Sequence, residues 1–183
     1  MTISVCIASR GRPEMLTKTV EQLSALAELP DTKISVALDL DDEKSAGWKS
    51  DNHRVTGSFA EREDSLGEKY NRAARGIAAD VYVLWADDVV TTTQGWDKKI
   101  QDAAGLFSDG IGVVYFGKIE GVLQPGIAVT AKMVELMGFF CVPWFGYWWV
   151  DTYIDEIGRM SDRIIHADVQ VELLQGLAGK RRS

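Results

Sequence analysis

Short apolar runs alternate with segments of helical periodicity from residue 3 to residue 116. The runs with the length and composition of buried strands are residues 3–8, 34–38, 54–59, 81–86 and 111–116. The intervening segments with apolar residues on one helical stripe are residues 14–27, 66–79 and 93–107. This alternation predicts an α/β fold with a mostly parallel central sheet flanked by helices.

The pattern changes after Gly117. A stretch at 127–137 predicts a strand that leads into a helix, and a dense block of aromatic residues follows between Phe139 and Tyr153. Beyond this block the periodicity predicts a helix over 149–160, a strand over 163–167 and a last helix over 169–178. Because the chain contains no internal repeat and no linker-like stretch, we expect a single domain.

Composition and charge narrow the possible functions. The chain has 183 residues, is 46% hydrophobic and carries a formal net charge of −7, which fits one globular domain and disfavours nonspecific binding to nucleic acid. The two cysteines, Cys6 and Cys141, are far apart in apolar surroundings and are expected to be buried free thiols. No apolar run is long enough for a membrane span and no signal peptide is apparent, so the expected location is the cytoplasm.

Candidate chemistry follows three of the predicted strands. The segments concerned are Ser9 to Arg12, Asp39 to Glu43, and Asp87 with Asp88. The carboxyl ends of parallel strands meet at one edge of a sheet, where ligands bind. Carboxylates gathered there attract a hard cation such as Mg²⁺ or Mn²⁺, and arginines beside them can bind phosphate. The acidic stretch taken alone could equally be a solvated loop. Glycine-rich dinucleotide and P-loop motifs are absent from the sequence.

Four segments of the chain, taken in their order and spacing, resemble the nucleotide-binding half of a GT-A glycosyltransferase of the family 2 type. They are residues 3–13, 39–42, 70–88 and 95–96. The resemblance implies a hexosyltransferase-type enzyme that moves a sugar from a nucleotide-diphosphate donor to an acceptor hydroxyl. It also implies inversion, dependence on Mn²⁺ or Mg²⁺, a nucleotide-binding half of about residues 1–117 and an acceptor-side half of about residues 118–183.

The resemblance also assigns roles to individual residues. The residues implied in binding the nucleotide are Ser9, Arg10, Arg12, Asp39, Asp41 and Asn71. Trp85 stands where the family has the first aspartate of its Asp-x-Asp motif, which leaves Asp87 as the implied metal ligand with Asp88 in reserve. His166 lies where some members of the family place a further metal-side histidine.

The acceptor side is implied by the segment from Gly146 to Asp151. The family carries Glu-Asp there, the aspartate being the general base, and this sequence has Val150 and Asp151. Asp151 is therefore the implied base that takes the acceptor proton, although an aspartate at this position could also cap the helix that begins there. Trp148 and its aromatic neighbours could stack on a sugar, or they could form core or an association surface.

Two alternatives remain open from the sequence. Asp39, Asp41, Lys69 and the later Asp87 and Asp88 occur in the order found in haloacid-dehalogenase-like phosphoryl transferases. A catalytically degenerate GT-A domain that binds a sugar or a partner would explain Trp85 and Val150. The expected partners are a nucleotide-sugar donor and a hydroxyl-bearing glycan, lipid or protein acceptor, with a homo-oligomer possible and nucleic acid not expected.

Overall fold

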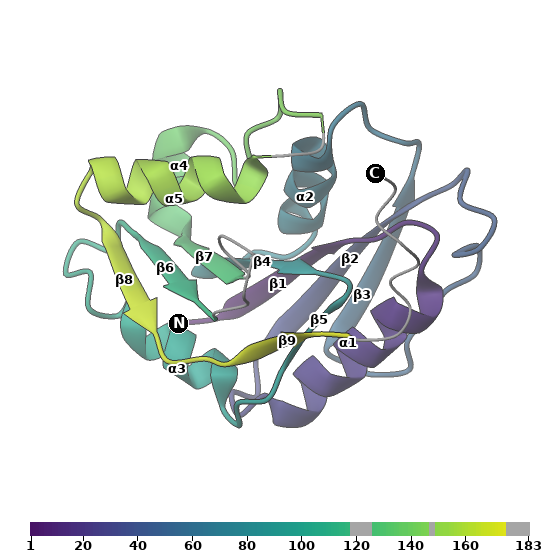
Figure 1. Ribbon diagram of the computed structural model, residues 1–183, viewed down its shortest axis with the longest axis horizontal. Coiled ribbons are helices and arrows are strands. Elements are labelled where there is room, and N and C mark those ends of the chain that lie inside the picture. The colour runs from purple at the N-terminus through teal and green to yellow at the C-terminus, as the bar shows by residue number, and fades with distance from the viewer. Residues whose placement is uncertain (118–125, 147–148, 175–183) are drawn as a thin grey trace.

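A seven-stranded sheet forms the centre of the molecule (Figure 1). The computed structural model describes residues 1–117, 126–146 and 149–174. Strands β1 (Ile3–Ala8), β2 (Lys33–Asp39), β3 (Val55–Ala60) and β4 (Val81–Ala86) are parallel, and all six residues of β1 are buried. This arrangement confirms the α/β class and the mostly parallel sheet predicted from the sequence.

The other half of the sheet contains the one antiparallel strand. The sheet order is β3-β2-β1-β4-β7-β6-β8, in which β7 (Gly126–Thr130) lies between β4 and β6 (Val113–Phe116) and is antiparallel to both. The last strand, β8 (Ile164–Ala167), pairs with β6 in parallel. The predicted boundary between halves falls beside residues 118–125, which lie outside the described part of the chain.

Helices cover both faces of the sheet (Figure 1). Residues of α1 (Pro13–Leu26) and α3 (Trp96–Ala104) share one buried cluster with Val5 and Ile7 of β1. Residues of α2 (Leu66–Arg75), α4 (Ala131–Met137) and α5 (Val150–Met160) share the other cluster with Cys6 and Ala8. Because successive side chains of a strand point to opposite faces, the apolar residues of β1 supply both cores.

The helix predicted over residues 169–178 is wrong. Residues Val171–Leu173 form strand β9, which pairs antiparallel with β5 (Val89–Thr91) in a second, two-stranded sheet. Val169 and Val171 are buried and Gln170 and Glu172 are exposed, and this period of two is typical of a strand. Residues 175–178 lie outside the described part of the chain.

Two predicted helices are longer than the helices observed. The helix expected over 66–79 ends at Arg75, where the Gly76 N–H binds the carbonyls of the last turn. The helix expected over 93–107 begins at Trp96, because Gly95 has a φ of 64° that stops the helical backbone at its N-terminus. None of the helices in the described residues has the length and apolar character needed to cross a membrane.

Candidate functional site

The carboxyl ends of β1 and β4 lie side by side and bring Ser9 and Asp87 together. The register pairs Ala8 with Ala86, so the residue after each strand faces the other. The Ser9 hydroxyl donates a hydrogen bond of 2.6 Å to Oδ2 of Asp87. Asp87 is only 1% exposed, and this burial raises the pKa of its carboxyl group. An aspartate so poorly hydrated depends on the groups around it for stabilisation of its charge.

Arg12 provides the positive charge that faces this carboxylate. Its Nη2 lies 2.5 Å from Oδ1 of Asp87, and its Nη1 donates a hydrogen bond of 3.0 Å to Oδ2 of Asp88. The loop that carries Arg12 turns at Gly11, which has a φ of 71° and donates its N–H to Oδ2 of Asp42 at 2.6 Å. The Asp42 carboxylate therefore ties this loop to the segment that follows β2.

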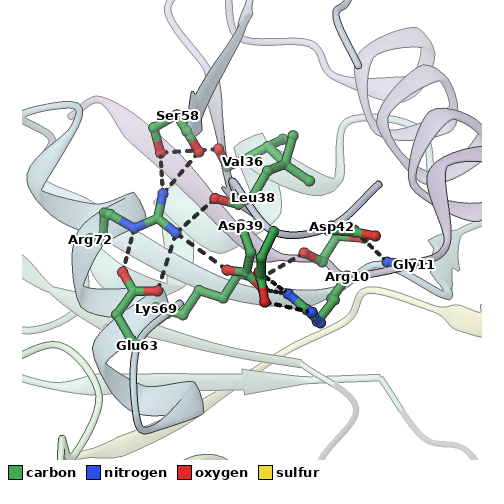
Figure 2. Close-up of polar contacts among 12 residues, drawn as sticks. Arg10, Gly11, Val36, Leu38, Asp39, Asp42, Ser58, Glu63, Lys69 and Arg72 are labelled. Carbon is green, nitrogen blue, oxygen red and sulfur yellow. Dashed lines mark hydrogen bonds and ion pairs between the residues drawn. The ribbon is translucent and has the colours of Figure 1, made fainter. Parts of the chain in front are cut away.

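A second cluster of charges lies at the end of β2 (Figure 2). Asp39 is 2% exposed and forms ion pairs with Lys69 at 2.7 Å, Arg10 at 2.9 Å and Arg72 at 3.8 Å. Figure 2 shows Arg72 directed to Ser58, Leu38 and Glu63 as well, and it contacts all three through hydrogen bonds. These contacts fix α2 against the ends of β2 and β3.

Lys69 and Arg10 extend this cluster toward the end of β1. The Lys69 ammonium group also donates to the carbonyl of Ser9 at 2.8 Å, and burial lowers the pKa of Lys69. Arg10 forms a two-pronged pair with Asp41, with N–O distances of 2.5 and 3.0 Å. This pairing holds the pKa of Asp41 below its usual value. Both arginines of the Ser9 to Arg12 loop are therefore engaged by carboxylates.

A cavity of about 700 Å³ opens where these strand ends meet α2 and α5. Its size is within the range of small-molecule sites in proteins. The sequence-predicted site residues that line it are Ser9, Arg10, Arg12, Asp87, Asp88 and Asp151. Trp149, one of the aromatic neighbours of Trp148 considered for stacking on a sugar, lines it as well. Sequence reasoning gave no site role to Tyr70 and Leu173, which also line it, and considered Lys69 only for phosphoryl transfer. The sequence assigns Tyr70 to the apolar stripe of this helix. Lys69 is its neighbour in sequence, and this position could have indicated that Lys69 also lies at the site.

Asp151 lies in the first turn of α5, on the wall of the cavity formed by that helix. Its Oδ1 accepts a hydrogen bond of 2.8 Å from the N–H of Thr152, so the carboxylate sits at the N-terminus of the helix as well as on the cavity. Trp149, two residues earlier, lines the same wall and has a φ of 80° and a 61% exposed side chain. Trp148 lies outside the described residues.

Four predicted site residues are not among those that line this cavity. Asp39 and Asp41 contact Arg10, which does line it. Asn71 is buried and bridges to the Cys141 carbonyl and to the Phe140 and Cys141 amides, beside a separate cavity of about 310 Å³. His166 is exposed on β8, with its ring 4.7 Å from that of Tyr115.

The carboxylates of Asp87 and Asp88 are suited to a hard divalent cation. The buried Oδ1 of Asp87 accepts no hydrogen bond from the described residues, although the Arg12 guanidinium lies against it. Across the described ranges, no three His, Cys, Asp or Glu side chains form a group that could hold a metal by themselves. Magnesium-type ions often use one or two carboxylates and complete their shell with substrate phosphate. Asp87 and Asp88 therefore fit a cation that is shared with a phosphate ligand.

Comparisons with known proteins identify the fold. No protein-family model and no curated protein sequence matches the chain. A mannosyltransferase from Pyrobaculum calidifontis, solved with GDP-Man and Mn²⁺, superposes with a TM-score of 0.71 at 12% identity over 96% of this chain and 58% of its own. S. aureus TarS 1-349, solved with UDP-GlcNAc, gives 0.68 at 14% identity over 100% of this chain and 60% of its own. The chain thus spans about three-fifths of each and has the fold of these proteins.

Proposed function

We propose that this protein is a glycosyltransferase that moves a sugar from a nucleotide-diphosphate donor to an acceptor hydroxyl. One observation carries the proposal: the cavity at the carboxyl ends of the strands is lined by Asp87 and Asp88, which follow β4, and by Asp151 from α5. Such a cavity offers carboxylates for a cation-bound diphosphate and a separate carboxylate for a proton. The donors GDP-Man and UDP-GlcNAc in the similar structures favour a nucleotide-activated hexose.

The donor binds at the ends of β1 and β4. Arg12 binds the diphosphate, Ser9 fixes the orientation of Asp87, and Arg10 binds the nucleotide while Asp39 and Asp41 hold its guanidinium in place. Asp87 and Asp88 hold the divalent cation, Mn²⁺ or Mg²⁺. When bound, this cation supplies positive charge that stabilises the leaving diphosphate.

Asp151 acts on the acceptor. As the acceptor oxygen forms its bond to the anomeric carbon, the bond from that carbon to the diphosphate oxygen breaks, and the acceptor proton passes to the Asp151 carboxylate. One attack from the face opposite the leaving group inverts the configuration of the sugar. Trp149 lies beside Asp151 with a largely exposed indole, so it can pack against the acceptor.

The phosphoryl-transfer alternative is disfavoured by the surroundings of Asp39. That mechanism requires this carboxylate to attack a phosphorus atom. Asp39 is instead buried, lies against Lys69 and Arg10, and is not among the residues that line the cavity. The position of Asp151 on the cavity wall favours turnover over a purely sugar-binding role.

The proposal is tested first by donor binding and then by transfer. We expect tryptophan fluorescence to report binding of one nucleotide sugar from a panel of UDP and GDP donors with Mn²⁺. Asp87→Asn should weaken that binding, because the charge that holds the cation is removed. Asp151→Asn should keep donor binding and lower the rate of transfer about 10²- to 10⁴-fold, the usual contribution of a general base.

Glu156→Gln is the matched control for Asp151→Asn. Glu156 is an exposed carboxylate on the same helix and is absent from the residues that line the cavity. Its substitution should leave both donor binding and transfer close to wild type. Full transfer by Asp151→Asn would contradict the assignment of the base, and failure to bind any nucleotide sugar would contradict the function itself.

A further inference from the structure

We infer that Arg12 acts as an internal counter-ion that holds Asp87 and Asp88 until the divalent cation and the nucleotide diphosphate bind together. In this scheme Arg12 leaves the two carboxylates as the cation arrives and binds the incoming diphosphate. The inference rests on the proposed function and deepens it. It makes Arg12 the residue that couples the binding of the cation to the binding of the donor.

The geometry shows that Arg12 occupies the face of the carboxylates that a cation needs. Its two terminal nitrogens reach one oxygen of each aspartate, Asp87 at 2.5 Å and Asp88 at 3.0 Å. The other oxygen of Asp87 accepts the Ser9 hydroxyl, so it is also engaged. A planar guanidinium is well suited to bridging two carboxylates in this way. A cation that is to bind Oδ1 of Asp87 and Oδ2 of Asp88 together must first displace Arg12.

The charges around the cavity explain why such a counter-ion is needed. Asp87 is almost completely buried and Asp88 follows it directly, so two negative charges are held close together in partly desolvated surroundings. The two other positively charged side chains among the described residues that line the cavity are already paired, because Arg10 pairs with Asp41 and Lys69 pairs with Asp39. Arg12 therefore stabilises these two aspartates in the protein without ligand.

The same charges oppose a diphosphate that arrives alone. A diphosphate brought to Asp87 and Asp88 is repelled by their negative charges. Arg12 cannot keep its ion pairs with both aspartates and also bind the phosphates. A divalent cation bound by the aspartates removes this conflict and frees Arg12 for the phosphates. The Arg12 side chain is 42% exposed, so it can turn without disrupting the core. Each ligand then raises the affinity of the other, as thermodynamic linkage requires.

The decisive measurement is the affinity of the protein for Mn²⁺ alone, followed by electron paramagnetic resonance of the free ion. We expect weak binding to the wild type and about tenfold tighter binding to Arg12→Met, because the competing positive charge is gone. Arg12→Lys keeps a charge at this position without the bridging guanidinium and should bind Mn²⁺ more weakly than Arg12→Met does. UDP or GDP without metal should bind Arg12→Met more weakly than wild type.

Arg10→Met is the matched control. It removes the same charge from the same loop, but Arg10 contacts Asp39 and Asp41 in place of Asp87 and Asp88. Its effect on Mn²⁺ affinity should stay within about twofold, as expected for a screened charge at longer range. Unchanged or weaker Mn²⁺ binding by Arg12→Met overturns the inference, as does an equal gain in Arg10→Met. Because Mn²⁺ alone is the probe, these results are independent of whether any donor sugar is bound.

Discussion

Single carboxylates position the loops of the site. Asp42 is buried and accepts the N–H of Gly11, while its backbone carbonyl accepts the N–H of Ser45. Asp41, its neighbour in sequence, is largely exposed and holds Arg10 from the solvent side. Two adjacent aspartates thus have different tasks, one fixing the backbone of the arginine loop and the other fixing one arginine side chain.

Asp42→Ala should destabilise the protein in a pH-dependent way. Burial tends to raise the pKa of Asp42, but hydrogen bonds from Ser45, Gly11 and Lys44 lower it below the ordinary value. A carboxyl whose pKa is lowered by folding contributes stability above the ordinary aspartate pKa, about 4, and loses it as the pH falls through the lowered value. Thermal unfolding at pH 7 should therefore show a loss of about 1–3 kcal/mol.

The same comparison at acid pH checks the cause. As the pH falls below the ordinary aspartate pKa, the difference in melting temperature between wild type and Asp42→Ala should shrink, since the wild-type carboxyl becomes protonated. Asp41→Ala, which removes an exposed ion pair, should have a smaller effect on stability than Asp42→Ala at pH 7. A loss in Asp42→Ala that is constant across pH would show that the charge of Asp42 does not matter.

The helix α2 is the element that joins the two sides of the site. Ser65 caps it by accepting the N–H of Glu68 at 3.0 Å. One turn later Lys69 and Tyr70 reach the cavity, and the Tyr70 hydroxyl donates to the carbonyl of Trp85 on β4. The first turn packs so closely on the segment at 142–143 that a Cβ on Gly67 would lie 2.0 Å from the Val142 carbonyl oxygen.

Gly67→Ala is therefore expected to destabilise the protein despite improving helix propensity. Propensity alone favours alanine by about 1 kcal/mol, whereas forced overpacking typically costs about 1–3 kcal/mol. Denaturation in urea should show a net loss of stability, and donor binding should weaken because Lys69 and Tyr70 move with the helix. Gly146→Ala, where an added Cβ meets nothing within 4 Å, is the control and should be nearly neutral.

At the scale of the molecule, one side chain links the helix that carries the site to the segment before α5. The Asn71 side chain donates to the Cys141 carbonyl at 2.7 Å and accepts the Phe140 and Cys141 amides at 3.0 and 2.8 Å. All three residues are buried, and Phe140 and Cys141 belong to the apolar cluster that α2 shares with the sheet. Residues 140 and 141 are thus held to α2 by a satisfied polar network in an apolar core.

Asn71→Ala should destabilise the whole protein by about 3 kcal/mol or more, because three buried groups lose their partners. We expect far-UV circular dichroism and tryptophan fluorescence to show coincident unfolding transitions in urea, as for one cooperative unit. Arg75→Ala, on the exposed side of the same helix, should have little effect. If Asn71→Ala separated the two transitions, the halves would be folding independently.

Two strands that the sequence predicts well are β1, which is completely buried, and β4, which is mostly buried. β1 and β4 are apolar runs that end in polar residues, and this was enough to place Ser9 and Asp87 at one edge. β5 and β9 are only three residues long and owe their existence to pairing with each other. The alternation at residues 169–172 fits a strand but is short, and local periodicity does not reveal its pairing with the distant β5, so the sequence predicts a helix over 169–178 instead.

The pairing of charges could not be predicted for a similar reason. The sequence predicts both arginines at the nucleotide site. In the structure Arg10 forms ion pairs with Asp39 and Asp41, whereas Arg12 forms ion pairs with Asp87 and Asp88. This choice depends on the register of β1 against its two neighbours and on the turn at Gly11. Asn71 was predicted at the nucleotide, and only the three-dimensional packing reveals its contacts with residues 140 and 141.

The pairing of β9 with β5 also affects how the protein is made. The N–H of Leu174 donates to the carbonyl of Asp88, and Leu173 lines the cavity, so the wall beside the paired aspartates comes from a segment synthesised long after them. A nascent chain on the ribosome can form β1 to β4 early, but contacts between distant segments form slowly and late. This cavity is therefore complete only after residue 174 has left the ribosomal tunnel, so on the proposed function unfinished chains should not bind nucleotide sugars.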